Sequence, residues 1–192
     1  MKFYAVKNGR KNGIFTDWES CRAQVDGFSG AEYKSFSKEE DAKAYLKGKK
    51  ETKMGETVAY VDGSFNLSTG EYSFGAVVFV NGEIEEFSEK FSDTQMAEMR
   101  NVAGEIKGAE FVMRYCVERG IPSVRIIYDY MGIEAWATGA WKTNKTGTKQ
   151  YKAYYDSIKD KLKVTFEKVK GHSGDKYNDR ADALAKEALG IK

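Results

Sequence analysis

Hydrophobic residues form five short runs within residues 58–192, and runs of this length, rich in β-branched and aromatic side chains, predict β-strands. The runs cover about residues 58–64, 72–80, 84–91, 124–129 and 164–169. Between the third and fourth runs the apolar spacing changes to three and four residues, which predicts one long helix from about Gln95 to Glu118. Shorter helices are predicted over about 131–138, 149–162 and 178–189. Three consecutive strands followed by alternating helices and strands predict an α/β fold, with a mixed five-stranded sheet and helices on both faces.

The first 46 residues carry a separate, shorter pattern. Strands are predicted at about 3–6 and 14–15, a loop and a third strand within 28–36, and two helices that end near residues 25 and 46. Thr16 and Glu19 form a capping box that would open the first of these helices. Residues 47–57 are polar and charged and have no apolar periodicity, which is typical of a linker. We therefore expect a small α+β domain over 1–46, a linker over 47–57 and the α/β domain over 58–192.

Charge is unevenly distributed along the chain. The net charge is only +2, yet residues 1–55 hold 12 of the 31 lysines and arginines and only 8 of the 29 acidic residues. This excess favours a polyanionic partner for the N-terminal part.

Cysteine and histidine are scarce. Cys21 and Cys116 each fall on an apolar helical face, which indicates reduced core thiols and an intracellular protein. Two cysteines and the single His172 exclude cysteine or histidine zinc sites. The N-terminus lacks an apolar signal core, and no run is long enough to span a membrane. We expect a soluble, cytoplasmic protein.

Four carboxylates stand at the edges of the predicted apolar surfaces. Asp62 lies inside the first strand, where an ionised acid costs several kcal/mol unless it is hydrogen-bonded or bound to a cation. Glu105 borders the apolar stripe of the long helix, Asp129 ends a buried strand, and Asp182 lies in the first turns of the last helix. If they converge, two Mg²⁺ ions, with Mn²⁺ as a substitute, would hold all four ionised. On this pattern alone each acid could instead be an ordinary surface or capping carboxylate.

The motifs around these acids resemble those of type 1 ribonuclease H, in order, over essentially all of residues 58–192. They are YVDGS (60–64), NVAGE (101–105), IYD (127–129), VKGHSG (169–174) and NDRAD (178–182). The resemblance implies the ribonuclease H-like sheet and assigns metal binding to the four acids. It further implies endonucleolytic hydrolysis of the RNA strand of RNA/DNA hybrids, leaving 5′-phosphate and 3′-hydroxyl ends. His172 would assist proton transfer or product release.

Residues 3–46 independently resemble the hybrid-binding domain attached to many such enzymes, through YAVKNGRK (4–11), GF (27–28) and YKSF (33–36). The two resemblances imply contacts to the hybrid by Gly63, Ser64, Arg100 and Asn101 in one domain and by Tyr4, Trp18, Tyr33 and Lys34 in the other. Aromatic faces would pack against deoxyribose, and lysine and backbone amides would take phosphates. We expect an RNA/DNA hybrid as partner, no obligate protein partner, and a monomer.

Some positions depart from the family pattern. Arg100 stands where several relatives carry threonine, and Tyr130 where many carry serine. The segment 136–149 is shorter than in relatives with a basic helical handle, so we expect no handle here. Arg10 could contact phosphate or form a solvated charge pair with Lys11, and the pattern leaves both open.

Two other classes of protein compete with this interpretation. A noncatalytic hybrid-binding protein would not need an intact set of four acids. A DNA nuclease or recombinase could share the fold, but the GHSG loop (171–174), Asn101 and the N-terminal module disfavour it.

Overall fold

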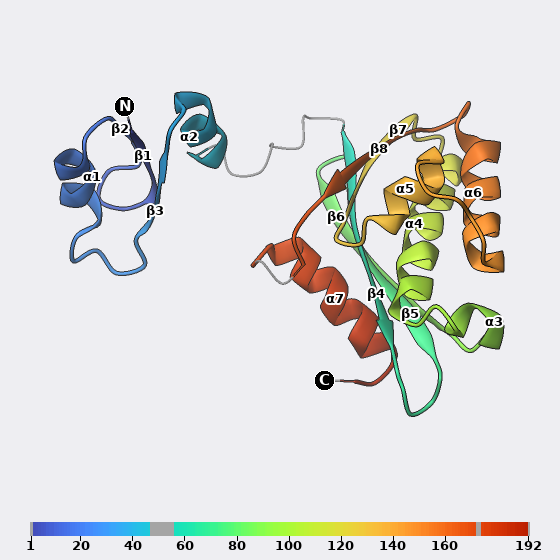
Figure 1. The fold of residues 1–192 in the computed structure, drawn as a ribbon. Helices are drawn as coiled ribbons and strands as arrows, with labels where there is room; N and C mark the ends of the chain where they lie inside the picture. Colours follow the sequence, from blue (N-terminus) through green and yellow to red (C-terminus); the bar gives the residue numbers. More distant parts are fainter. Residues whose placement is uncertain (1, 47–55, 172–173, 192) are drawn as a thin grey trace. The chain divides into compact units, whose positions relative to one another are not determined.

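The structure is a computed structural model that describes residues 2–46, 56–171 and 174–191. The chain divides into two compact units, Met1–Lys53 and Met54–Lys192. The first carries a three-stranded sheet and the second a five-stranded sheet, and each unit has its own hydrophobic core (Figure 1).

The first unit is a small α+β fold. Its elements are β1 (Phe3–Asn8), β2 (Gly13–Phe15), α1 (Trp18–Val25), β3 (Glu32–Phe36) and α2 (Glu39–Leu46). The strands are antiparallel in the order β2-β1-β3. Val6, Cys21 and Val25 are buried together between the sheet and α1. The predicted arrangement of three strands and two helices is confirmed.

Helix α1 begins differently from the prediction. Asp17 is its N-cap residue, and the Asp17 carboxylate accepts a hydrogen bond from the Ser20 N–H at 2.8 Å. This backbone hydrogen bond lowers the pKa of Asp17, because the ionised carboxylate is the better acceptor at the positive end of a helix. The predicted capping box of Thr16 and Glu19 is therefore wrong by one residue. Threonine and aspartate are both good N-caps, and two adjacent candidates do not reveal which one starts the helix.

The second unit is built on a mixed five-stranded sheet, as predicted, and its strands lie in the order β6-β5-β4-β7-β8. Its strands are β4 (Thr57–Phe65), β5 (Tyr72–Val80), β6 (Glu83–Phe91), β7 (Ser123–Tyr128) and β8 (Lys163–Lys168). The first three are antiparallel neighbours, and β7 and β8 run parallel to β4.

Helices cover both faces of this sheet. They are α3 (Thr94–Ala97), α4 (Asn101–Glu118), α5 (Gly132–Thr138), α6 (Thr146–Ile158) and α7 (Lys176–Ala188). Helices α4, α5 and α6 lie on one side and α7 lies alone on the other (Figure 1). The larger core fills the α4 side, while Tyr60, Ile127 and Leu184 belong to a smaller core under α7. None of the described helices is both long and apolar enough to cross a membrane.

The predicted single helix 95–118 is wrong, because the chain turns at Arg100 and separates α3 from α4. Arg100 has φ 55° and ψ −133°, a strained conformation for a residue with a side chain. The apolar stripe of α4 starts only at Val102, whereas Met96 of α3 lies against Gly147 of α6. Both segments contact α6 and the larger core, so the helix is interrupted by the backbone conformation of Arg100 and not by a change of apolar neighbours.

Backbone touches backbone where α4 crosses the sheet. A Cβ atom added to Gly63 would overlap the Asn101 carbonyl oxygen, and one added to Gly104 would overlap the Ser73 carbonyl oxygen. Glycine inside a helix costs about 1 kcal/mol relative to alanine, so its presence at position 104 indicates a close approach there. The sheet backbone is what approaches.

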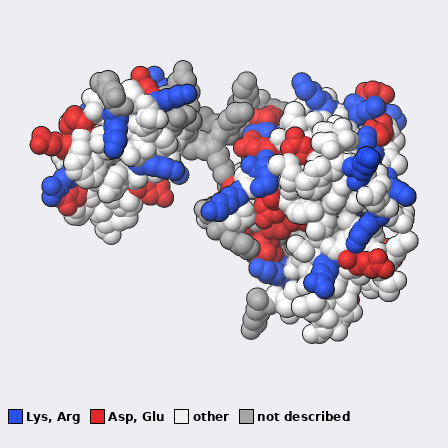
Figure 2. All heavy atoms as spheres, viewed as in Figure 1, with Lys and Arg blue, Asp and Glu red and all other residues white. Residues whose placement is uncertain are grey.

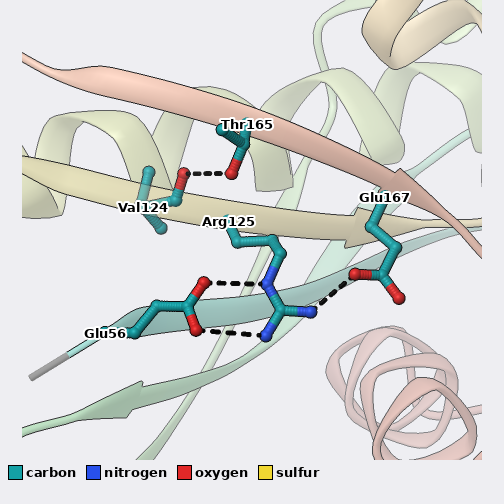
Figure 3. Close-up of polar contacts among 5 residues, drawn as sticks. All are labelled: Glu56, Val124, Arg125, Thr165 and Glu167. Carbon is teal, nitrogen blue, oxygen red and sulfur yellow. Dashed lines mark hydrogen bonds and ion pairs between the residues drawn. The ribbon is translucent and has the colours of Figure 1, made fainter. Parts of the chain in front are cut away.

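Arg125 of β7, which is buried, pairs with two partly exposed glutamates (Figure 3). Its Nε donates to Glu56 Oε1 at 3.1 Å, and its Nη1 donates to Glu167 Oε2 at 2.5 Å. Glu56 immediately precedes β4 and Glu167 lies on β8. One side chain thus ties together three neighbouring strands at the end of the sheet where the second unit begins.

Candidate active site

Three carboxylates meet at one end of the sheet. Asp62 comes from β4, Glu105 from α4, and Asp129 directly follows β7. One carboxylate oxygen from each lies within 4.8 Å of the others. Asp62 and Glu105 are only 7% and 2% exposed, so two of the three acids are buried. The close contact between Gly63 and α4 places Glu105 next to the strand that carries Asp62.

The surroundings disfavour the ionised form of these acids. Burial, and then the charge of Asp129, raises the pKa of Asp62 to about 7, although a hydrogen bond from the Gly63 N–H at 2.7 Å opposes the shift. Burial, followed by the charges of Asp62 and Asp129, raises the pKa of Glu105 well above its usual value. Such a group of acids is stabilised by a cation.

The residues fit a divalent metal ion. Glu105 Oε2 is buried and has no hydrogen-bond partner among the described residues, which leaves it available as a ligand. Carboxylate oxygens are the ligands preferred by Mg²⁺ and, less strictly, by Mn²⁺. Asp62, Glu105 and Asp129 could therefore hold a metal at this end of the sheet.

The fourth predicted acid lies beside this group but is not part of it. Asp182, on α7, contributes to the raised pKa of Asp62, so its charge is felt at the cluster. Its Oδ2, however, accepts a hydrogen bond from Lys186 Nζ at 2.7 Å in an ion pair. Figure 2 shows acidic side chains gathered near α7 with basic side chains on either side. Lys186 was not predicted, because its only signal is its spacing of four residues from an acid, which is common on helix surfaces.

The remaining candidates of this unit lie at the start of α4 and along β4. Gly63 and Ser64 directly follow Asp62 on the strand, and Ser64 is buried. Arg100 and Asn101 are exposed where the chain turns into α4.

Arg100 and Asn101 also line a groove of about 400 Å³. It is bordered by Glu98, Met99, Val102, Tyr130, Trp136, Lys142, Asn144, Lys145 and Thr148. The two lysines were not predicted, because they lie in a loop with no periodicity. Their signal was the basic composition of this loop between two helices. The ring of Tyr130 packs against Trp136, so the residue that departs from the family pattern forms part of the groove wall.

His172 lies outside the described residues, but the loop before it is described. A Cβ atom added to Gly171 would overlap Asp129 Oδ2. The loop backbone therefore passes directly against one of the three clustered acids, and a side chain at position 171 would require the Asp129 carboxylate to move.

In the first unit, three of the four predicted contacts form an aromatic surface. The ring centroids of Tyr4 and Trp18 are 5.6 Å apart, and those of Trp18 and Tyr33 are 5.8 Å apart. Trp18 and Tyr33 are 42% and 45% exposed, so neither is a core residue. Lys34 is exposed, with its ammonium 5.8 Å from the centre of the Phe36 ring.

Arg10 has a structural role in this unit. Its Nη1 donates to the backbone carbonyl oxygens of Ala23 and Asp26, at 3.2 and 2.7 Å. It thereby ties the turn after β1 to the end of α1.

Comparison with known proteins gives two family matches. Residues 2–46 match the family described as the ribonuclease H1 N-terminal domain, and residues 54–190 match the RNase H family. Ribonuclease H of Francisella philomiragia is 30% identical over 143 residues, covering 72% of this chain and 93% of that protein.

Two further relatives match a shorter stretch of the chain. Ribonuclease H of Saccharomyces cerevisiae is 52% identical over 44 residues, and ribonuclease H1 of Homo sapiens is 51% identical over 45 residues. Each match covers 23% of this chain, but only 13% of the yeast protein and 16% of the human one.

Solved structures share the fold of the second unit. RNase H1 from Halobacterium salinarum has a TM-score of 0.59 at 23% identity, covering 70% of this chain and 98% of that one. LC11-RNase H1, solved in complex with an RNA/DNA hybrid, has a TM-score of 0.55 at 20% identity, covering 70% and 97%. The predicted ribonuclease H-like fold is thus confirmed. Since the RNase H match over residues 54–190 takes in more than half of the chain, the protein belongs to the ribonuclease H family.

Proposed function

We propose that this protein is an endoribonuclease that hydrolyses the RNA strand of RNA/DNA hybrids with the help of divalent metal ions. The observation that carries the proposal is the group of three carboxylates within 4.8 Å, two of them buried. Holding ionised acids in this arrangement is unfavourable without a cation. Because the chain belongs to the ribonuclease H family, we assign hydrolysis of the RNA strand to this site.

Asp62, Glu105, Asp129 and Asp182 are the residues that would hold two Mg²⁺ ions, which Mn²⁺ could replace. When bound, such a pair of ions activates a water molecule and stabilises the leaving oxygen of a phosphodiester, giving 5′-phosphate and 3′-hydroxyl ends. The Gly63 N–H holds Asp62 Oδ1 in place at 2.7 Å. His172, the residue after Gly171 in the sequence, would carry a proton during the reaction, since imidazole titrates near neutral pH.

Selectivity for RNA requires recognition of the 2′-hydroxyl group, which DNA lacks. The groups placed to recognise it are the backbone amides near Gly63 and Ser64 and the side chains of Asn101 and Glu105. Arg100, beside Asn101 in the groove, is suited to a phosphate of the hybrid.

The N-terminal unit would hold the same class of nucleic acid. Tyr4, Trp18 and Tyr33 present adjoining aromatic rings to sugars or bases, and Lys34 offers a charge for a phosphate. Neither role requires a second protein, and we propose that the chain acts as a monomer.

Cleavage of an end-labelled RNA/DNA hybrid in Mg²⁺ tests the proposal, with a DNA duplex of the same sequence alongside. Wild type should cut only the RNA strand, and Asp62→Asn should abolish cutting while still binding the hybrid. Asp156→Asn is a matched control, because Asp156 is an exposed acid on α6 paired with Lys152, and it should cut normally. Wild type that binds the hybrid but cuts it with neither Mg²⁺ nor Mn²⁺ would instead be a hybrid-binding protein.

A further inference from the structure

The position of Asp182 differs from that of the other three acids. Asp62, Glu105 and Asp129 face one another, whereas Asp182 is paired with Lys186 one turn further along α7. The pair has a short nitrogen–oxygen distance of 2.7 Å, and the lysine side chain is 39% exposed.

The backbone of α7 is fixed beside the cluster. Gly75 is the partner of Asp62 in the β4–β5 ladder, and a Cβ atom on Gly75 would overlap the Ala181 carbonyl oxygen. The Ser73 hydroxyl also donates to the Ala185 carbonyl oxygen at 2.6 Å. Since the helix is held at both points, Asp182 can reach a metal only by turning its side chain, and that movement must break or weaken the pair with Lys186.

We propose that Lys186 is a positioning residue that competes with a divalent ion for Asp182 and so weakens the second of the two metal sites. This inference rests on the proposed function, since it concerns the same site. In the metal-free protein the ammonium neutralises Asp182 and keeps it apart from the three clustered acids. When an ion binds at Asp182, the lysine loses its partner and its charge repels the ion. The other site, at Asp62, Glu105 and Asp129, does not involve this lysine.

The expected size of the effect follows from the exposure of the pair. The interaction energy of two unit charges 4 Å apart in a water-like medium corresponds to about a five-fold change in an equilibrium constant. Partly exposed ion pairs have interaction energies in this range. Removing the charge of Lys186 should therefore tighten the weaker metal site about five-fold and leave the tighter site unchanged.

Binding of Mn²⁺, followed by the electron paramagnetic resonance signal of the free ion, measures both sites without any reaction. We expect wild type to show a tighter and a weaker class of site. Lys186→Met and Lys186→Gln should tighten only the weaker class, while Lys186→Arg, which keeps the charge, should resemble wild type. Lys152→Met is the matched control, because it breaks an ion pair of the same spacing at 2.6 Å on α6, and it should change neither class. Thermal unfolding without metal checks that each variant is folded.

The inference is overturned if folded Lys186→Met and Lys186→Gln keep the wild-type affinity of the weaker class, or if both classes shift together. It is also overturned if Lys152→Met gives the same change, or if only one class of site exists. Cleavage of the hybrid by the same preparations separates this outcome from the proposed function. Normal cleavage together with unchanged Mn²⁺ affinities refutes only the role of Lys186 and not the proposed function. A tightened weaker site in a protein that never cleaves the hybrid refutes only the proposed activity.

Discussion

Replacing Asp62 with asparagine should stabilise the metal-free protein above neutral pH, although it removes a residue proposed to be essential for cleavage. Burial, and then the charge of Asp129, raises the pKa of Asp62 from 3.8 to about 7. Above pH 7 the folded protein must hold an ionised carboxylate that its surroundings disfavour. Asparagine has nearly the same shape and no charge, so Asp62→Asn removes this cost.

The magnitude follows from the shift in pKa. Each unit corresponds to about 1.4 kcal/mol, so the difference between 3.8 and about 7 corresponds to about 4 kcal/mol once Asp62 is ionised. Between about pH 4 and pH 7 the folded state retains a proton that the unfolded state has released, so the stability of wild type falls as the pH rises. The advantage of Asp62→Asn should therefore grow from near zero at about pH 4 to about 4 kcal/mol at pH 8. For a chain of 192 residues this is roughly 10 °C in Tm.

Differential scanning calorimetry in EDTA at several pH values between 4 and 8.5 measures the effect. Asp156→Asn is the control, because the hydrogen bond from Lys152 lowers the pKa of Asp156, so its loss should not stabilise the protein. Saturating Mg²⁺ should raise the Tm of wild type more than that of Asp62→Asn, since only wild type keeps the full set of ligands. A difference in stability between the two proteins that does not depend on pH, or an Asp62→Asn variant that is less stable throughout, would refute the reasoning.

Gly104→Ala should lower the free energy of unfolding by about 3 kcal/mol, because the new Cβ overlaps the Ser73 carbonyl oxygen. Gly108→Ala should be close to neutral, because its new Cβ would lie 3.2 Å from the Cβ of Phe74. Urea denaturation compares the two, and equal losses would contradict the account of the close approach. In the same assay Arg125→Met should lower the free energy of unfolding by about 2–3 kcal/mol, because two glutamates lose their shared partner. An unchanged denaturation midpoint would show that the network does not stabilise the sheet. Trp18→Ala should weaken hybrid binding about ten-fold in a fluorescence anisotropy titration in EDTA, with little change in Tm, since this ring is largely exposed. Wild-type affinity in that variant would exclude the aromatic surface as a binding site.

Strand positions in the second unit could be predicted closely from the sequence, because β4, β5 and β7 are buried and largely apolar and the Asn81-Gly82 turn separates β5 from β6. The predicted starts at residues 58, 72, 84, 124 and 164 lie within one residue of the observed starts at 57, 72, 83, 123 and 163. The turn at Arg100 could not be predicted in this way. Met96, Met99 and Val102 are apolar and follow one another at steps of three residues, as in one continuous helix, and only the backbone conformation of Arg100 shows the break.

The clustered acids were visible in the sequence for a related reason. Asp62 and Asp129 interrupt or end apolar strands, and Glu105 adjoins an apolar stripe, so each stands out against its surroundings. The pairing of Asp182 with Lys186 could not be predicted, because acids and lysines four residues apart are common on helix surfaces and seldom matter. Its importance comes only from the neighbouring cluster, which the sequence of α7 does not contain.

The contact between α4 and the sheet through Gly63 and Gly104 has a consequence for how this domain can evolve. Beside the site, the approach of Glu105 to the strand that carries Asp62 is set by main chain in contact with main chain, at Gly63 and Gly104, and core side chains meet only further along α4, for instance at Gly108. Apolar residues elsewhere in the interior can be exchanged, for instance during adaptation to another temperature, without moving the two acids relative to each other. Selection for stability and selection for the geometry of the site can therefore act on largely separate sets of residues.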